Sequence, residues 1–392
     1  MIFWPIALLS LAVWIYLFFF RGLFWLNREC ENTNHPKMDL STWPSVVAII
    51  PSRNEEKTLP VSLPALLEQD YKGFLSIIVV DDESEDATFA VAQNISKNAK
   101  RFVSVLSGKT LLSSKWTGKV WALHQGVVEA EKLQIPCTYY LFTDADIVYG
   151  KASLTNLILE ALNKESLLTS FMVKLHCQSS AEKFLIPAFV YFFNMIYPFS
   201  WVNRKDTKIS AAAGGCLLVD KLTLERAGGL STIQASLIDD CALAKNIKPY
   251  GPIWLGFANT IQSIREYSNW HEIRYMVSRT AFAQLNNSYL LLLGTILGMV
   301  ITFLSPPFVM FFGPYPLNLL GCLTWLIMTI TFIPTIRYYK CSLLLSMSLP
   351  LIAATYMVFT LDSALQNFLG KGGFWKGRVQ AFKNNDDGSK RP

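Results

Sequence analysis

Three acidic segments of this sequence each follow a short apolar run. They are Pro51-Ser52-Arg53-Asn54-Glu55-Glu56, Asp81-Asp82-Glu83-Ser84-Glu85-Asp86-Ala87-Thr88 and Thr143-Asp144-Ala145-Asp146. Oxygens in the first two can accept hydrogen bonds from the N–H groups of a base and the hydroxyls of a ribose; alternatively, Ser84 and Asp86 only cap a helix. In the third, one residue separates Asp144 from Asp146, so both carboxylates can approach one hard cation that also binds substrate phosphates.

Two further motifs add a cation, two glycines and an acid pair. Gly118-Lys119 stands at the expected start of a helix, where backbone N–H groups, the helix dipole and a positive charge suit a phosphate; a solvated lysine is the alternative. Gly214-Gly215 allow a ligand to approach the backbone closely. Asp239-Asp240 precede a helix. They either only favour the helix dipole, or one of them takes the proton from an attacking hydroxyl.

These motifs need a sheet whose strands end at one edge. Apolar runs alternate with helical patterns in the order 46–50, 55–69, 76–80, 86–99, 102–106, 119–132 and 139–143. Continuous apolar strands separated by helices predict an α/β fold with a mostly parallel sheet covered by helices on both faces. Ligands bind at the carboxyl ends of the strands in such sheets, which is where the acidic segments fall.

The two ends of the chain are apolar, whereas its middle has the composition of a soluble domain. Of the 392 residues, 52% are apolar and 16% are charged, against about 25% charged residues in soluble domains. Residues 1–20 carry no charge and match a bilayer in length; they lack the basic region and cleavage site of a signal peptide. We expect a transmembrane anchor over 1–26. Arg21, Arg28 and Lys37 follow it, which predicts a cytoplasmic catalytic part on the plasma membrane if the source is bacterial.

A C-terminal transmembrane bundle is expected over residues 289–361. Its apolar stretches are roughly 289–312, 317–336 and 343–361. Three full crossings would place the basic tail, 362–392, on the side opposite the catalytic part, against the positive-inside rule. A bent path around Pro350, or an imperfect first stretch interrupted at Ser305-Pro306-Pro307, would resolve the conflict. We expect a cytoplasmic tail.

Residues 180–201 form a separate aromatic-rich segment that Pro187 and Pro198 interrupt. A segment broken in this way does not predict a clean membrane span. A position in the membrane interface is favoured over a buried core helix.

The order of the motifs resembles the family 2 inverting glycosyltransferases with a GT-A fold. The motifs are P-x-R-N-E, V-D-D-x-S-x-D-x-T, G-K-x-x-A-L, D-A-D, G-G and D-D, and they cover roughly residues 44–285. The membrane layout, Trp254-Leu255-Gly256 and the tail Trp375-Lys376-Gly377-Arg378 look most similar to the hopene-associated glycosyltransferases, which are relatives of the ceramide glucosyltransferases. The resemblance implies a Rossmann-like GT-A domain that transfers a sugar, with inversion, to a lipid or polyprenoid acceptor, with a hopanoid as one candidate. The donor would be a nucleotide-sugar, with a UDP-sugar expected.

The resemblance also assigns donor-side roles. Glu55 and Asp82 would contact the nucleoside. Lys119 and Asp144 would contact the donor, and Asp144 with Asp146 would hold Mg²⁺ or Mn²⁺.

On the acceptor side, Asp240 would be the catalytic base with Asp239 beside it, and Gly214-Gly215 would lie near the acceptor. The sequence departs from the family pattern in three places. Glu83 replaces the usual glycine, which leaves the nucleotide open, and Asp239 replaces a glutamate. The Q-x-x-R-W motif of processive synthases is absent, which predicts a single transfer rather than polymer synthesis.

Other classes of protein fit less well. A transporter or channel subunit with a nucleotide-binding domain would need polar groups within its spans, whereas Asp362 lies at an end of one. A silent nucleotide-binding fold would have lost its carboxylates, and a NAD enzyme would carry G-x-G-x-x-G after a strand. The net charge of +6 gives no nucleic-acid signature. The seven scattered cysteines predict neither a disulfide framework nor a zinc site.

Overall fold

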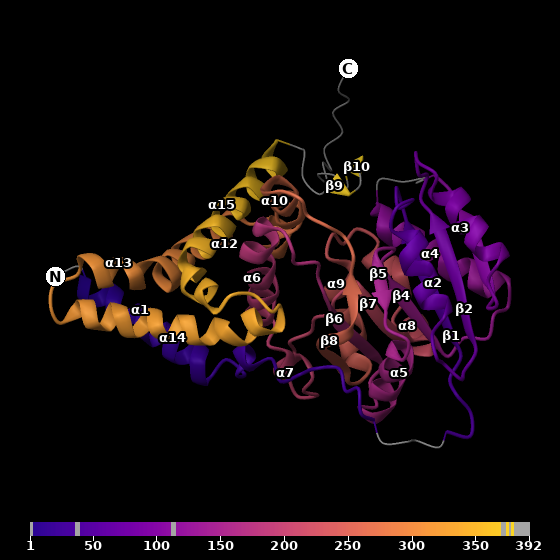
Figure 1. Ribbon diagram of the computed structural model, residues 1–392, viewed down its shortest axis with the longest axis horizontal. Helices are drawn as coiled ribbons and strands as arrows, with labels where there is room; N and C mark the ends of the chain where they lie inside the picture. Colours follow the sequence, from indigo (N-terminus) through magenta and orange to yellow (C-terminus); the bar gives the residue numbers. More distant parts are fainter. Residues whose placement is uncertain (1–2, 36–39, 111–114, 370–373, 376–377, 380–392) are drawn as a thin grey trace.

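The computed structural model describes residues 3–35, 40–110, 115–369, 374–375 and 378–379. A sheet flanked by helices forms one end of the molecule and a bundle of helices forms the other (Figure 1). Lys37, Lys376-Gly377 and the basic residues beyond 380, which the sequence analysis used, lie outside the described residues.

One eight-stranded sheet carries the site. Its strands are β1 (Val46–Ser52), β2 (Leu75–Asp81), β3 (Val103–Ser107), β4 (Tyr139–Thr143), β5 (Ile147–Tyr149), β6 (Leu168–Lys174), β7 (Cys216–Asp220) and β8 (Ile253–Ser263). They lie in the order β3-β2-β1-β4-β7-β6-β8-β5. The β1–β2, β2–β3, β1–β4 and β6–β8 pairs are parallel, and β7 and β5 run antiparallel to their neighbours. The predicted α/β class is therefore confirmed. β1 lies between β2 and β4, which are the strands that precede the other two acidic segments.

Helices cover both faces of this sheet, because alternate strand residues point to opposite sides. Val46, Ala48 and Ile50 pack with α2 (Leu59–Leu67), α3 (Thr88–Lys97) and α5 (Ser153–Asn163). Val47 and Ile49 pack with α4 (Gly118–Lys132) and α9 (Asp239–Ile247). Every residue of β1 and β2 is buried. The continuous apolar runs in the sequence reflect this burial on both faces.

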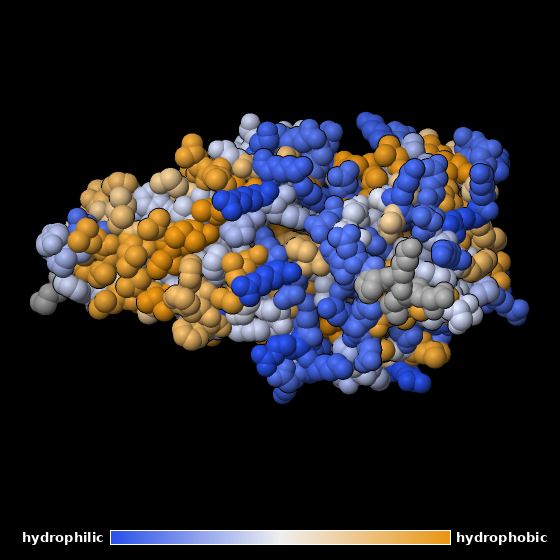
Figure 2. All heavy atoms as spheres, turned by 60° about the horizontal axis from the view of Figure 1, so that its bottom comes forward, coloured by the Kyte–Doolittle hydropathy of each residue, from blue (hydrophilic) through white to orange (hydrophobic). Residues whose placement is uncertain are grey.

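The helical bundle is apolar on its outside. It comprises α1 (Phe3–Phe19), α12 (Tyr289–Met299), the π-helical turn η4 (Val300–Leu304), α13 (Ser305–Phe312), α14 (Leu317–Tyr338), η5 (Leu343–Ser348) and α15 (Leu349–Phe368). Large apolar side chains such as Leu290 and Leu344 are 79% and 77% exposed, and Figure 2 shows hydrophobic residues gathered over this end. Apolar surface of this extent marks contact with a membrane or a protein.

By length and composition, four described helical segments could cross a membrane. They are Ser180–Val202, Tyr289–Phe312, Leu317–Tyr338 and Leu343–Phe368. In the first, Pro187 lies inside the continuous helix α6 (Ser180–Ile196), and Pro198 separates α6 from α7 (Phe199–Val202). More than half of the residues of α6 are buried, because it packs between the sheet and the bundle (Figure 1). An interfacial position for this segment stays a prediction.

The last apolar stretch turns back on itself. α14 ends beside the sheet, where the Tyr338 hydroxyl donates to the carbonyl of Ala258. η5 then runs back along α14, so that Trp325 Nε1 donates to the Met347 carbonyl over 3.1 Å. α15 returns toward the sheet and ends beside α10 (Trp270–Ser278) and α11 (Ala281–Gln284). The chain turns before Pro350, which lies in the first turn of α15. Whether this stretch crosses the membrane fully, and on which side the tail lies, stay predictions.

Candidate active site

The first two acidic segments form one unit at the carboxyl ends of β1 and β2. The Arg53 guanidinium donates to the carbonyls of Asp82 and Glu83 over 2.6 and 2.8 Å. The Asp82 N–H donates to the Ser52 carbonyl over 2.8 Å. Asp82 is fully buried, and Glu55 is 6% exposed. Arg53 therefore fixes the edge at which both predicted nucleoside contacts stand.

Glu83 has a left-handed backbone, with φ of +51°. That conformation costs a non-glycine residue about 1–2 kcal/mol, which explains why glycine is usual at this position. The Glu83 side chain accepts a hydrogen bond from Thr110 Oγ1 over 2.6 Å. The turn thus has a left-handed conformation that glycine would adopt without strain, although glutamate occupies the position.

Arg265, which follows β8, joins two of the predicted site residues. Its Nη2 lies 2.6 Å from Glu55 Oε1 and its Nε lies 3.0 Å from Asp146 Oδ2. Ser263 Oγ donates to the same Asp146 oxygen over 2.9 Å. Burial alone would lower the pKa of Arg265, but the Asp146 and Glu55 carboxylates raise it above its usual value. Sequence reasoning missed Arg265, because no motif marks the end of β8.

Lys119 connects the donor side of the site to the acid pair. It lies in the first turn of α4, and its Nζ is 2.7 Å from Asp144 Oδ1 and 3.7 Å from Asp239 Oδ2. Its side chain is 19% exposed, so it is not a freely solvated lysine. Burial would lower the pKa of Lys119, but the charges of Asp144 and Asp239 hold it above the usual value. Burial also raises the pKa of Asp144, although Lys119 opposes this.

Asp240 stands in the first turn of α9 with both carboxylate oxygens anchored. Oδ2 accepts the Gly214 N–H and Oδ1 accepts the Cys241 N–H, each over 2.7 Å. Burial, with the neighbouring charge of Asp239, raises the pKa of Asp240 to about 6 against the opposing effect of Lys119 and the two hydrogen bonds. A base with a pKa near the working pH is well matched to proton transfer.

The two glycines serve different purposes. A Cβ at Gly214 would lie 3.1 Å from Lys119 Nζ and 3.2 Å from Asp240 Oδ2, so the glycine keeps this part of the site open. A Cβ at Gly215 would lie 2.9 Å from Val173 Cγ2. Core packing alone accounts for Gly215, and its place near the acceptor stays a prediction.

Asp144 and Asp146 stay predicted as ligands of a divalent ion that arrives with a diphosphate. Within the described ranges, no three His, Cys, Asp or Glu side chains converge on one point. Mg²⁺ commonly uses one or two carboxylates and completes its shell with substrate phosphates and water. The positive charges of Lys119 and Arg265 already neutralise the two carboxylates. A divalent ion without a diphosphate would therefore find little negative charge left to bind.

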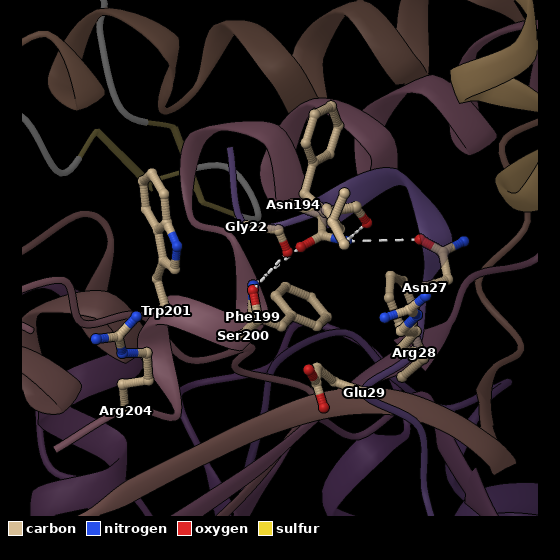
Figure 3. A pocket seen from close by; sticks show the side chains of 12 residues that line it. Gly22, Asn27, Arg28, Glu29, Asn194, Phe199, Ser200, Trp201 and Arg204 are labelled. Carbon is tan, nitrogen blue, oxygen red and sulfur yellow. Dashed lines mark hydrogen bonds between the residues drawn. The ribbon is translucent and has the colours of Figure 1, made fainter. Parts of the chain in front are cut away.

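The surface of the molecule also contains hollows. One of about 490 Å³ is lined by Glu55, Thr58, Asp86 and Arg265, among others, and adjoins the predicted nucleoside contacts. Another, of about 300 Å³, lies where the segment that follows α1, residues 22–29, meets α6 and α7 (Figure 3). There Asn194 Nδ2 donates to the Phe24 carbonyl over 2.7 Å and Ser200 Oγ donates to the Gly22 carbonyl over 2.7 Å. None of the predicted site residues lines this second hollow, whose bonds fasten α1 to the catalytic part.

Comparison with known proteins agrees with this geometry. Residues 47–226 match the family model described as "Glycosyl transferase family 2". The mannosyltransferase PcManGT from Pyrobaculum calidifontis, solved in complex with GDP-Man and Mn²⁺, has a TM-score of 0.55 at 16% identity over 93% of this chain and 98% of its own. Residues 47–226 thus resemble the family that the motifs indicated, and the shared architecture shows the predicted GT-A fold.

Curated relatives match a shorter region. The 4,4'-diaponeurosporenoate glycosyltransferase of Staphylococcus haemolyticus is 30% identical over 126 residues, which are 32% of this chain and 30% of the relative. That of Staphylococcus aureus strain RF122 is 34% identical over 106 residues, 27% of this chain and 24% of the relative. The chain thus spans under a third of the length of the curated relatives it matches.

Proposed function

We propose that this protein is a membrane glycosyltransferase that transfers one sugar from a nucleotide-sugar to a lipid acceptor, with inversion at the anomeric carbon. The observation that carries the proposal is the Lys119 bridge, which brings a donor-side carboxylate, Asp144, to the acid pair at the start of α9. Donor and acceptor groups thereby meet at one point, as a direct transfer requires.

The residues divide the chemistry between them. Glu55 and Asp82 bind the nucleoside, and Lys119 binds the diphosphate. Asp144 and Asp146 would hold a Mg²⁺ or Mn²⁺ ion, which would supply positive charge to offset the charge on the departing nucleoside diphosphate.

Inversion needs only one group on the acceptor side, and Asp240 is placed to supply it. The acceptor hydroxyl oxygen forms the new bond to the anomeric carbon as the bond to the diphosphate breaks. Asp240 takes the hydroxyl proton in the same step. Asp239 stays beside it, and its negative charge helps to raise the pKa of Asp240.

The lipid acceptor is supported by the apolar bundle and by the relatives, which are named for diaponeurosporenoate. A polyprenoid is the acceptor class that fits both, with a hopanoid as a further candidate from the motif resemblance. We place the catalytic part, 44–285, on the cytoplasmic side between the anchor, 1–26, and the bundle, 289–361. A UDP-sugar is the first donor to test.

The decisive experiment is transfer by the purified protein. Wild type and Asp240→Asn are incubated with a panel of UDP- and GDP-sugars, Mg²⁺ or Mn²⁺, and a membrane lipid extract. Mass spectrometry should detect a lipid whose mass has risen by one sugar residue, only with wild type. Release of nucleoside diphosphate without any glycosylated lipid across the whole panel would overturn the lipid acceptor.

A further inference from the structure

A third hollow, of about 560 Å³, separates α9 from the bundle. Its walls come from the ends of α1 and α6, the segment before β7, the loop that leads into α9, and α11. We call it the α9–α11 hollow; the lining residues that matter here are Arg21, Lys208, Ile238, Cys241, Lys245 and Gln284. Its volume is that of a pocket for one small molecule or head group.

The α9–α11 hollow is positively charged. Arg21, Lys208 and Lys245 line it, and no carboxylate of the described residues does. Lys208 and Lys245 are exposed and form no ion pair within the described part of the chain. Arg21 is fixed, because it donates to the carbonyls of Met195 and Ile196 over 3.1 and 2.9 Å. An anion in the hollow would therefore meet two uncompensated ammonium groups.

The rest of the lining combines apolar with uncharged polar side chains and adjoins both the membrane part and the proposed reaction centre. Ile196, Ile209 and Leu237 contribute hydrocarbon surface. α11 leads directly into α12, one of the apolar segments of the bundle. At the other side, Ile238 and Cys241 flank the Asp239-Asp240 pair in the chain. A molecule here would lie between the bilayer boundary and the first turn of α9.

We propose that the α9–α11 hollow holds the head of the lipid acceptor and that this head carries a negative charge, as a phosphate or a carboxylate. The proposal rests on the proposed function and adds the charge class of the substrate. A neutral lipid would leave the two lysines without a partner, and a small soluble anion would leave the apolar walls exposed. An amphipathic anion matches both the two lysines and the apolar side chains of the lining.

The direct test is binding to the full-length protein in phosphatidylcholine nanodiscs. The probes are farnesyl phosphate, farnesoate, neutral farnesol and inorganic phosphate. We expect both anionic lipids to bind at least about 10-fold more tightly than farnesol, and Lys208→Glu/Lys245→Glu to lose at least about 10-fold of that affinity. Lys97→Glu/Lys100→Glu is the matched control, since it makes the same charge change at the end of α3 and should bind as wild type does.

The outcomes separate this inference from the proposed function. Equal affinity for farnesol and farnesyl phosphate, or an unaffected lysine variant, would overturn the charged head group. Inorganic phosphate binding as tightly as farnesyl phosphate would overturn the lipid. Lysine-dependent lipid binding by a wild type that transfers no sugar would instead refute the proposed function and leave the site standing. Transfer to a neutral lipid, with an acceptor KM that the lysine variant does not change, would overturn the charged head group and leave the proposed function standing.

Discussion

Replacing the proposed base is the sharpest test of the site, and Asp240→Asn changes one oxygen to nitrogen without changing size. The wild-type carboxylate accepts two backbone N–H groups, from Gly214 and Cys241. An asparagine has one acceptor oxygen and a donor NH₂ group. The asparagine oxygen can accept a hydrogen bond from one of the two backbone N–H groups. The other backbone N–H then faces the asparagine NH₂ group, which cannot accept a hydrogen bond.

The size of the effect on stability follows from the shifted pKa. Raising the pKa of Asp240 from 3.8 to about 6 corresponds to about 3 kcal/mol, at 1.36 kcal/mol per pKa unit. Because the folded-state value lies above the unfolded one, the associated stability is fully present below about pH 4 and is lost as the pH rises through about 6. At pH 7.5 wild type thus carries a destabilising ionised group. Asparagine removes this cost and loses one hydrogen bond, worth about 1–3 kcal/mol.

We therefore expect Asp240→Asn to unfold at or slightly above the wild-type temperature at pH 7.5, while its transfer rate falls about 10²–10⁴-fold. In wild type, kcat/KM should fall as the pH drops through about 6, because the protonated acid cannot accept the hydroxyl proton. Initial rates of nucleoside diphosphate release from pH 5 to 8 and thermal unfolding in detergent measure both effects. Near-wild-type turnover of Asp240→Asn with a dead Asp239→Asn would refute the assignment, as would a rate independent of pH down to 5.

Three further predictions test the donor side and the membrane path. Asp146→Ala should abolish transfer and leave the protein folded; full activity of this variant in a chelator would exclude the metal role. Arg265→Ala should lower the free energy of unfolding by about 3 kcal/mol, because it leaves the buried Glu55 and Asp146 carboxylates without their cation. Arg265→Lys, which keeps the charge, should lose less, and an unchanged melting temperature in both variants would contradict this account. A cysteine introduced at Ser389, outside the described residues, should resist an impermeant thiol reagent applied to intact cells; labelling from outside would place the tail on the far side of the membrane.

The sequence alone predicted the framework of the site. β1, β2 and β4 are mostly apolar because nearly all of their residues are buried, and this pattern is local enough to read from the chain. Parallel strands end at a common edge, so the acidic segments that follow them had to lie near one another. The apolar ends were equally evident, because a bilayer requires long uncharged helices.

Only the tertiary structure decided how the charges pair. Arg265 contacts Asp146 and Glu55 across 119 and 210 residues of sequence, and Lys119 joins two motifs that the sequence shows only as separate segments. The return of η5 along α14 and the charged α9–α11 hollow likewise depend on contacts between distant segments. Strand and helix patterns arise from neighbouring residues and can be predicted from them, whereas ion pairs and hollows depend on how the completed elements pack.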